Sequence, residues 1–449
     1  MPIFALIDGN SFYASCQIAF EPALRHRPVV VLSNNDGCIV AANAIAKSLN
    51  QELMAKVKNL GQGGYRSANP TNMMFQPYFK VKWLLDKHRA AVFSSNYELY
   101  ADMSSRMHSI IGEFAPNQEV YSIDESFIDL TGLSHLNLTH YGQEIKQSVL
   151  RSLGLPVAVG IGPSKTLAKL ANHLAKKHAG YDGVLDLTAL PESVVDSLLG
   201  HVDVGDIWGI GRRLSSRLNA EGIQSAFDLK HANTKRIRKT YGVVVERTVQ
   251  ELNGISCLSL EEVYADKKQI ISSRSFGKPV ADYLQLEQAV ISYVSRAAEK
   301  LRRQKGVCSM VSVHITTNRF KPGHYTNTRT IPLIYPSDNS ILLAKHARRA
   351  LKSIWVPGLA YHKAGVVLSE IMPKGPLQED IFAPGPTFSG NPKQDRLMSV
   401  LDQVNQKEGR GSLFLASTGI PKKNTWSMQR NLMSPRYTTR WDEMLRVGG

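Results

Sequence analysis

The stretch YSIDESF, residues 121–127, places Asp124 directly beside Glu125 within a run of residues that favour β-structure. Side chains alternate between the two faces of a strand, so one of two adjacent carboxylates would face the apolar side. Burying an unpaired charge costs several kcal/mol, and a buried carboxylate is therefore usually paired, protonated or bound to a metal ion. The stretch predicts that something cationic lies next to these two acids.

A third acid closes the short apolar run IFALID at the N-terminus, where Asp8 ends an expected strand. If the two strand ends lie side by side in one sheet, the three carboxylates converge on a site for hard divalent ions such as Mg²⁺, which prefers oxygen ligands. Two such ions can activate a hydroxyl and stabilise the leaving oxygen in phosphoryl transfer. The alternative is that these acids cap turns or form surface ion pairs.

Composition and charge narrow the class of protein. The 449 residues suggest about two to four domains, and 43% hydrophobic with 20% charged residues is a globular composition. The net charge of +16 attracts polyanions, with nucleic acid as the first candidate. Four widely spaced cysteines contain no CxxC pattern and fit a reducing compartment. The N-terminus resembles neither a signal peptide nor a transmembrane helix, so we expect a cytoplasmic protein without membrane contact.

The N-terminal half alternates strand and helix patterns. Residues 28–43 predict a hairpin around Asn34–Gly37 that leads into a helix at Ala44–Leu49. Residues 50–75 are rich in Gly, Asn and Gln and show no firm period, so we expect a loop or a small excursion there. The run VAVGIGPSKTLAKLANHLAKK predicts a strand followed by an amphipathic helix.

The C-terminal half predicts a helical region and then a small α+β domain. Residues 191–254 are helical in pattern and punctuated by glycines, and residues 266–372 follow the order β-α-β-β-α-β. This second segment contains 17 Lys and Arg against six Asp and Glu, so its net charge of +11 is most of the excess of the chain. The Pro- and Gly-rich residues that follow predict a linker.

The combined motifs resemble the Y-family translesion DNA polymerases, most closely their UmuC-like branch, the catalytic subunits of bacterial DNA polymerase V. The resemblance follows the chain in order through DGNSFYAS, SNNDGCIVAANAIAK, SSNYELYADMS, YSIDESFIDLTG, VGIGPSKTLAKLANHLAKK, DIWGIGRRL and SPRYTTRWDEMLRV. It implies an α+β multidomain fold shaped like a right hand. The expected parts are a ferredoxin-like palm (1–20 and 90–172), fingers (21–89, with an unusual insertion near 50–75), a helix-hairpin-helix thumb (173–254), a β-α-β-β-α-β little finger (266–372), and a linker and partner-binding region (373–449).

The resemblance assigns roles to the residues around the acids. It implies that Asp8, Asp124 and Glu125 are catalytic and hold two Mg²⁺ ions, with the main-chain carbonyl of Gly9 as a further ligand. It also implies that Tyr13 is the steric gate, whose ring clashes with the 2′-hydroxyl of a ribonucleotide. Without the resemblance, Tyr13 would be interpreted as a core aromatic on a helix.

The nucleotide triphosphate is expected to contact two lysines and the start of a helix. By the resemblance, Lys47 and Lys169 place ammonium groups on the phosphates, and the backbone of Asn10, Ser11 and Phe12 approaches them in the manner of other helix N-termini. For a lysine on an amphipathic helix, a solvated face is the simpler alternative.

Two regions are expected to bind DNA. Residues 204–223 resemble a helix-hairpin-helix in which Gly209 and Gly211 permit a tight turn with exposed amides, while Arg212 and Arg213 add charge. An ordinary turn between helices is the alternative. In the basic segment 266–372, Arg274 is expected to contact DNA as well.

A peptide in the expected linker resembles a sliding-clamp-binding motif. In it, Ile381 and Phe382 would enter an apolar groove of the clamp while Gln378 fixes the orientation. A glutamine followed by an Ile-Phe pair also arises by chance.

Together these features predict a DNA-directed DNA polymerase that performs error-prone translesion synthesis in the SOS response, by transfer from a dNTP to a primer 3′-hydroxyl. The resemblance implies primer-template DNA, a UmuD′-like dimer, RecA and the sliding clamp as partners, and association with the nucleoid when active. Two alternatives are a palm-fold nucleotide cyclase and a non-catalytic DNA-binding repair subunit. The hairpin motif and the +11 segment argue against the first, and the presence of all three acids argues against the second.

Overall fold

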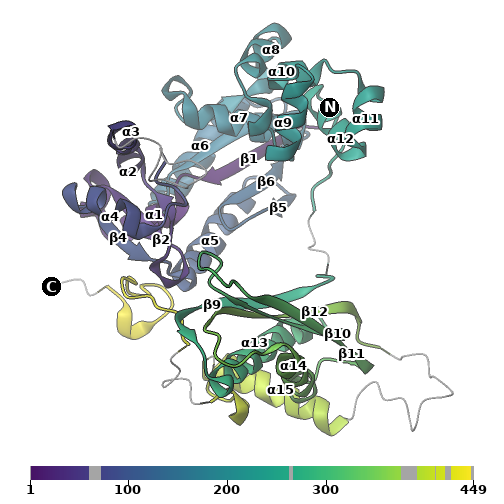
Figure 1. Cartoon of the computed structure of the whole chain (residues 1–449). Coiled ribbons are helices and arrows are strands. Elements are labelled where there is room, and N and C mark those ends of the chain that lie inside the picture. Colours follow the sequence, from purple (N-terminus) through teal and green to yellow (C-terminus); the bar gives the residue numbers. More distant parts are fainter. Residues whose placement is uncertain are drawn as a thin grey trace. The chain divides into compact units, whose positions relative to one another are not determined.

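The computed structural model describes residues 2–59, 72–261, 266–375, 392–409, 411–419 and 426–445. The chain divides into two compact units (Figure 1). The first contains Met1–Tyr264 together with Leu432–Gly449, and the second contains Ala265–Asn431. Within the described ranges, no helix is both long enough and apolar enough to cross a membrane.

A five-stranded sheet lies at the centre of the first unit, in the order β5-β6-β1-β7-β8. Strand β1 is antiparallel to both β6 and β7, and β7 is parallel to β8. The strands are β1 (Phe4–Gly9), β5 (Gln118–Val120), β6 (Glu125–Asp129), β7 (Val157–Gly162) and β8 (Val184–Asp186). The strands predicted around Asp8 and around Glu125 are therefore confirmed, and they are direct neighbours.

Helices cover both faces of this sheet. Successive apolar side chains of β1 point to opposite faces, so both faces need a covering layer. Ala5 and Ile7 join one core cluster with helices on one face, while Phe4 and Leu6 join a second cluster with Ala168 on the other face. The helices are α1 (Phe12–Phe20), α5 (Tyr97–Gly112), α6 (Leu138–Leu153) and α7 (Lys165–Lys177). The short turn between β1 and α1 thus keeps Asp8, near the end of β1, close to Tyr13 in the first turn of α1.

Helix α7 packs closely on β7 because Gly160 has no side chain. A Cβ at Gly160 would lie 2.1 Å from the backbone nitrogen of Asn172. The Asn172 amide donates to the carbonyls of Leu6 and Ala158 at 3.2 and 2.8 Å, which ties α7 to the two central strands. This contact fixes the position of the lysines on α7 relative to the end of β1.

The first unit also contains a small three-stranded sheet in the order β3-β2-β4. Two of its strands, β2 and β3, come from residues 28–43. The predicted hairpin is confirmed as an antiparallel pair of β2 and β3, and β4 adds a parallel strand. The elements are β2 (Val29–Leu32), β3 (Ile39–Ala42), α2 (Ala44–Ser48), α3 (Asn50–Asn59), α4 (Tyr78–Lys87) and β4 (Ala91–Ser94). Strand β4 belongs to this sheet and β8 to the five-stranded one.

The expectation of a loop throughout residues 50–75 is wrong at its N-terminal end, where α3 is a helix. Leu53 of α3 is fully buried, Lys56 lies 3.5 Å above the ring of Trp83, and Glu52 binds Lys87 and His88. Residues 50–56 form a helix because α4 supplies these partners, which a weak local period does not reveal. The rest of the expected insertion, residues 60–71, lies outside the described residues.

The helical region predicted after residue 191 is confirmed. It packs around one apolar core that includes Leu199, Leu218 and Val249. The helices are α8 (Glu192–Gly200), α9 (Arg212–Ala220), α10 (Ala226–Lys230), α11 (Thr234–Tyr241) and α12 (Val243–Leu252).

The second unit has the predicted β-α-β-β-α-β order, with the antiparallel sheet arranged β11-β10-β12-β9. Its two long helices share one core with one face of the sheet. The elements are β9 (Ile270–Val280), α13 (Tyr283–Arg303), β10 (Gly306–Thr317), β11 (Thr326–Ser337), α14 (Ser340–Ile354) and β12 (Tyr361–Pro373). The opposite face of the sheet is not covered by these two helices (Figure 1).

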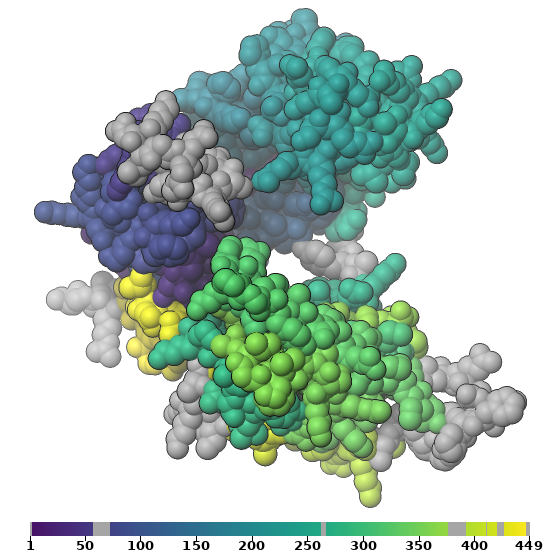
Figure 2. All heavy atoms as spheres, viewed as in Figure 1, coloured from purple at the N-terminus to yellow at the C-terminus, as the bar shows by residue number. Residues whose placement is uncertain are grey.

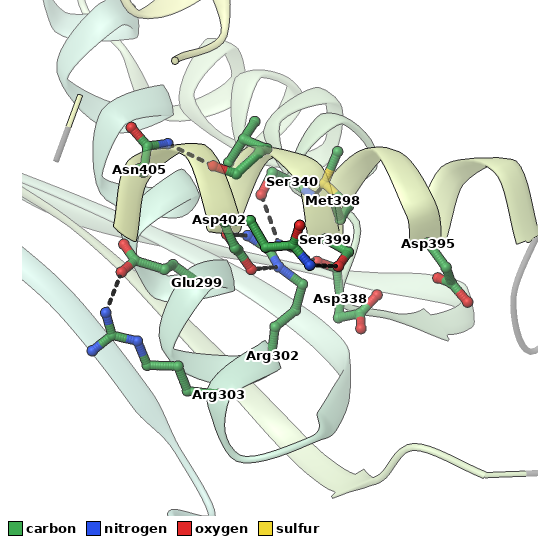
Figure 3. Close-up of polar contacts among 12 residues, drawn as sticks. Glu299, Arg302, Arg303, Asp338, Ser340, Asp395, Met398, Ser399, Asp402 and Asn405 are labelled. Carbon is green, nitrogen blue, oxygen red and sulfur yellow. Dashed lines mark hydrogen bonds and ion pairs between the residues drawn. The ribbon is translucent and has the colours of Figure 1, made fainter. Parts of the chain in front are cut away.

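The expected C-terminal region is divided between the two units. Helix α15 (Pro392–Lys407) packs on the second unit, where Arg302 donates to both carboxylate oxygens of Asp402 at 2.7 Å (Figure 3). Arg302 also donates to the carbonyl of Asp338 and to Ser340, and Met398 is buried against the same surface. Residues from Leu432 onward belong to the first unit instead.

Candidate active site

The three predicted acids lie at one end of the β1–β6 pair. Asp8 and Glu125 are direct partners across the two strands, so their side chains lie on the same face. Asp124 precedes β6 in a turn, where its carbonyl accepts from the Gly9 amide at 2.8 Å and its carboxylate accepts from the Ser122 hydroxyl at 2.7 Å. The alternation problem posed by adjacent acids is solved because Asp124 lies outside the regular strand.

Two lysines of α7 compensate two of these acids. Lys176 Nζ lies 2.6 Å from Asp8 Oδ1, and Lys169 Nζ lies 2.5 Å from Glu125 Oε1. Burial raises the pKa of Asp8 to about 6; Lys176 opposes the rise, while the charges of Glu125 and Asp124 add to it. Lys176 was missed by sequence reasoning, although its place at the end of the amphipathic helix pattern offered a signal.

The donor set fits a hard divalent cation. Carboxylate oxygens of Asp8, Asp124 and Glu125 are the ligands that Mg²⁺ prefers. Burial raises the pKa of Asp8 despite the Lys176 contact, so a bound cation would stabilise its ionised form. Among the described residues, no three His, Cys, Asp or Glu side chains already converge as a finished metal site. The acids are gathered at one place, where Asp8 and Glu125 pair with ammonium groups and the Asp124 carboxylate accepts from the Ser122 hydroxyl.

A cavity of about 250 Å³ adjoins the acids. It is formed where the β1–α1 turn, β3, α2 and the turn before β6 meet. Its lining includes Ser11, Tyr13, Ala42, Lys47, Met74 and Asp124. One acid, the expected steric gate and one expected phosphate-binding lysine therefore share a single concave surface.

The ring of Tyr13 is held by other aromatic rings. It stacks on Tyr100 of α5 with centroids 4.4 Å apart and planes 12° apart, and Tyr97 contacts it edge-on at 6.1 Å. Burial raises the pKa of Tyr13 to about 12, so the hydroxyl is neutral. A ring fixed on one side by a parallel stack has little freedom to move away from a ligand in the cavity.

The groups expected to contact the triphosphate already have partners within the protein to different degrees. Lys47 Nζ donates to the Ser11 hydroxyl at 3.0 Å, and burial lowers the pKa of Lys47, with Lys176 adding to the effect. Ser11 has a left-handed backbone, φ 49° and ψ 44°, at the cap of α1, and Phe12 is buried at the first turn. The amide of Asn10 donates to the Pro156 carbonyl at 2.9 Å, so this backbone group is already engaged in the fold.

Lys169 lies beside the acids because its ammonium pairs with Glu125. The same ammonium is 4.8 Å from the ring centre of Tyr121. The neighbouring Lys165 is 3% exposed and pairs with Glu119 at 2.6 Å. Lys165 thus pairs with a residue of β5, whereas Lys169 reaches the end of the β1–β6 pair where the three acids lie.

The predicted hairpin precedes α9 and presents its backbone to the outside. Gly209 has φ of 88°, and a Cβ at either Gly209 or Gly211 would meet no atom within 4 Å. Ile210 between them is buried, whereas Arg212 and Arg213 are exposed at the start of α9. This geometry suits a backbone contact with a phosphate, since two glycines flank one anchored residue.

Arg274 lies in β9, an edge strand of the second unit's sheet. It is the β9 partner of the fully buried Ala364, so it lies on the helix-covered face, where it lines a cavity of about 310 Å³ with Tyr293. Arg274 is exposed, and its contact with DNA stays a prediction. The predicted clamp-binding residues Gln378, Ile381 and Phe382 lie outside the described residues.

The open face of the second unit's sheet is rich in hydroxyl groups, which sequence reasoning missed. Paired positions across the sheet place Ser312 beside Thr330 and His314 beside Thr328, with side-chain contacts of 2.8 and 3.0 Å. Lys363 adds a charge on the same face, next to Thr316. The alternation in HITTNRF and TNTRTIP was the available signal.

Family models match most of the chain. The "impB/mucB/samB family" matches residues 7–173, and the "impB/mucB/samB family C-terminal domain" matches residues 267–381. A third, a "Domain of unknown function (DUF4113)", matches residues 395–447.

Full-length relatives and a solved structure agree with these matches. The chain is 44% identical to Protein UmuC of Salmonella typhimurium strain LT2 over 449 residues, covering 99% of this chain and 100% of the relative. It is 41% identical to Protein ImpB of Salmonella typhimurium, covering 98% and 99%, and 24% identical to DNA polymerase IV 1 of Bacillus subtilis strain 168, covering 90% of each.

The structure of a Y-family DNA polymerase chimera, Dbh-Dpo4(243-245)-Dbh, matches with a TM-score of 0.60 and 22% identity over 83% of this chain and 99% of that one. At this identity the likeness concerns the fold, and it confirms the predicted multidomain α+β polymerase architecture. Since the sequence matches run through the whole chain in the same order, the chain belongs to the impB/mucB/samB family and has the fold of the Y-family DNA polymerases.

Proposed function

We propose that the chain is a template-directed DNA polymerase of translesion synthesis in the DNA-damage response, which joins a dNTP to a primer 3′-hydroxyl. The observation that carries this proposal is that Asp124, which directly precedes the Asp8–Glu125 pair of neighbouring strands, lines a cavity together with Tyr13 and Lys47. The names of the relatives, UmuC and DNA polymerase IV, support the same activity.

Asp8, Asp124 and Glu125, with the main-chain carbonyl of Gly9, would hold two Mg²⁺ ions. When bound, the ions lower the pKa of the attacking hydroxyl and neutralise charge on the departing pyrophosphate. The protein's own part is to hold the oxygens rigidly at the end of two paired strands, so that little reorganisation accompanies the reaction.

Residues around the cavity orient the nucleotide. The Lys47 ammonium binds the triphosphate together with the backbone at Ser11 and Phe12, where the start of α1 favours negative charge. Lys169, near the acids, is the second basic contact. The stacked ring of Tyr13 excludes a 2′-hydroxyl and so selects deoxyribonucleotides.

DNA is bound through its backbone and independently of sequence, as copying requires. The Gly209–Gly211 hairpin with Arg212 and Arg213 supplies one contact surface. The hydroxyl-rich sheet face with Lys363 supplies another, within a segment of net charge +11. The partners UmuD′-like dimer, RecA and sliding clamp, and a cytoplasmic location with nucleoid association, remain predictions from the resemblance.

Primer extension by Asp124→Asn protein tests the activity. Extension on damaged and undamaged templates should fall by a factor of about 1,000 or more, while binding of primer-template DNA is retained. Asp129→Asn is the matched control, because Asp129 lies at the far end of β6, where its carboxylate accepts from the Thr131 amide. Equal extension by Asp124→Asn and wild-type protein would remove the acid assignment.

The alternatives predict other products. A cyclase would form a cyclic nucleotide from a nucleoside triphosphate without DNA, and a non-catalytic subunit would show no extension in the wild type. The family matches and the DNA-binding surfaces described above favour neither.

A further inference from the structure

Residues 432–443, here called the C-terminal strap, pack against the first unit beside the small sheet. The Ser94 amide donates to the Leu432 carbonyl at 2.9 Å, and the Leu432 amide donates to the Ser94 hydroxyl at 2.9 Å. Met433 forms a parallel bridge with Ser94. In Figure 2 the yellow surface of this region lies against the purple and blue surface of the N-terminal part of the chain.

The strap holds the beginning of α5 through Asn96. This fully buried side chain accepts from the Leu99 amide at 3.3 Å, which caps the helix. Its other end donates to the Ser434 carbonyl, the Ser434 hydroxyl and the Pro435 carbonyl, each at 3.1 Å. One amide therefore satisfies both the helix start and the strap, so displacement of the strap leaves a buried donor without its partners.

The same strap holds the end of α1 through Tyr437. The Tyr437 ring is 7% exposed and stacks on Phe20 with centroids 4.7 Å apart and planes 13° apart. Its hydroxyl donates to Glu21 Oε1 at 3.0 Å. The strap thus contacts the last residue of α1 and the residue beyond it.

These two helices carry the aromatic group around the expected gate. Tyr13 lies on α1, and its stacking partner Tyr100 lies on α5. Gln17 of α1 also donates to the Tyr100 hydroxyl at 2.8 Å. The separation of α1 and α5 therefore sets the position of the Tyr13 ring in the cavity.

We propose that the C-terminal strap is a positioning element for sugar selection, because it clamps α1 to α5 and so fixes the ring of Tyr13. This inference rests on the proposed polymerase function and on Tyr13 as the gate. It gives a role to part of the segment that matches a domain of unknown function. The strap residues are positioning residues, since none of them lines the cavity.

The test compares kcat/KM for a dNTP with kcat/KM for the matching rNTP in four full-length proteins: wild type, Tyr437→Ala, Tyr437→Phe and Trp441→Ala. Tyr437→Ala should reduce this ratio by a factor of about five to ten, because a small shift of a reacting or excluding group changes rates strongly. Tyr437→Phe keeps the stack on Phe20 and should remain near the wild type. Trp441 is in the same strap but 89% exposed, so Trp441→Ala is the matched control.

Two further measurements separate this role from general destabilisation. Loss of folded protein lowers both incorporation rates equally and leaves their ratio unchanged. Hydrogen exchange of the Leu99 and Tyr100 amides should become faster in Tyr437→Ala, since both amides bond to Asn96.

The inference and the function on which it rests fail in different ways. If Tyr13→Ala leaves sugar selection unchanged, the gate assignment fails. If Tyr13→Ala relaxes selection but Tyr437→Ala keeps the wild-type ratio, the strap proposal is overturned. In a Tyr13→Ala background, Tyr437→Ala should produce no further change in the ratio.

Discussion

Asp8 and Lys176 form an ion pair, with 2.6 Å between Oδ1 and Nζ, that joins the end of the central strand to the last turn of α7. The pair only partly offsets the burial of Asp8, whose pKa is still raised to about 6. The site therefore retains negative charge that the fold by itself does not fully stabilise. This is the state expected of a residue whose function is to bind a cation.

Asp8→Asn should stabilise the metal-free protein while abolishing polymerisation. A carboxyl group with a raised pKa favours the protonated form in the folded state, so its ionisation lowers the free energy of unfolding as the pH rises from about 4 to about 6. Because the raised pKa already includes the attraction of Lys176, removing that penalty should add up to about 3 kcal/mol at pH 7 in EDTA. Urea unfolding at pH 4 and at pH 7 measures this, and an equal effect at both pH values would contradict it.

Tyr13→Ala should admit ribonucleotides. Removing the ring leaves space where it now stacks on Tyr100, so the penalty against a 2′-hydroxyl should fall by a factor of about 10–100. Tyr13→Phe is the control, because it retains the ring and loses only the hydroxyl. Single-nucleotide insertion with dNTP and rNTP gives the ratio; if Phe and Ala variants behaved alike, ring bulk would not be the cause.

The buried Lys165–Glu119 pair should be important for stability. Both side chains are less than a tenth exposed. Lys165→Met would leave the Glu119 carboxylate buried, with the Glu261 backbone amide as the remaining hydrogen-bond donor to it among the residues that the structure describes. We expect a loss of about 3–5 kcal/mol. Combining it with Glu119→Gln should restore part of that loss in urea unfolding, and purely additive losses would argue against a direct coupling.

The open sheet face of the second unit should govern the salt dependence of DNA binding. Lys363→Ala should weaken binding uniformly across sequences and reduce the slope of log K against log salt by about 1. Lys352→Ala, on the exposed side of α14, is the control and should leave the slope unchanged. Identical slopes for both variants would mean that DNA lies elsewhere.

Much of the fold follows from local patterns. The strand ending at Asp8, the hairpin of residues 28–43 and the β-α-β-β-α-β order were all predictable, because side-chain period and turn residues act over a few positions. The convergence of Asp8 with Glu125 was predictable too, once two strand ends were taken as neighbours. Helix α3 was not, since its burial depends on Trp83 and on partners at the end of α4.

The sequence by itself determined which groups are present: three acids, one aromatic residue after the first strand, and a basic α+β segment. Only the tertiary structure decided that Lys176 faces Asp8, that Arg274 is the partner of Ala364, and that Asn96 and Tyr437 join the C-terminal strap to α5 and α1. The physical reason is the sequence separation over which each kind of interaction acts. Local propensity is set within a few residues, whereas these contacts bring together groups up to several hundred positions apart, and only the packed core fixes their distances.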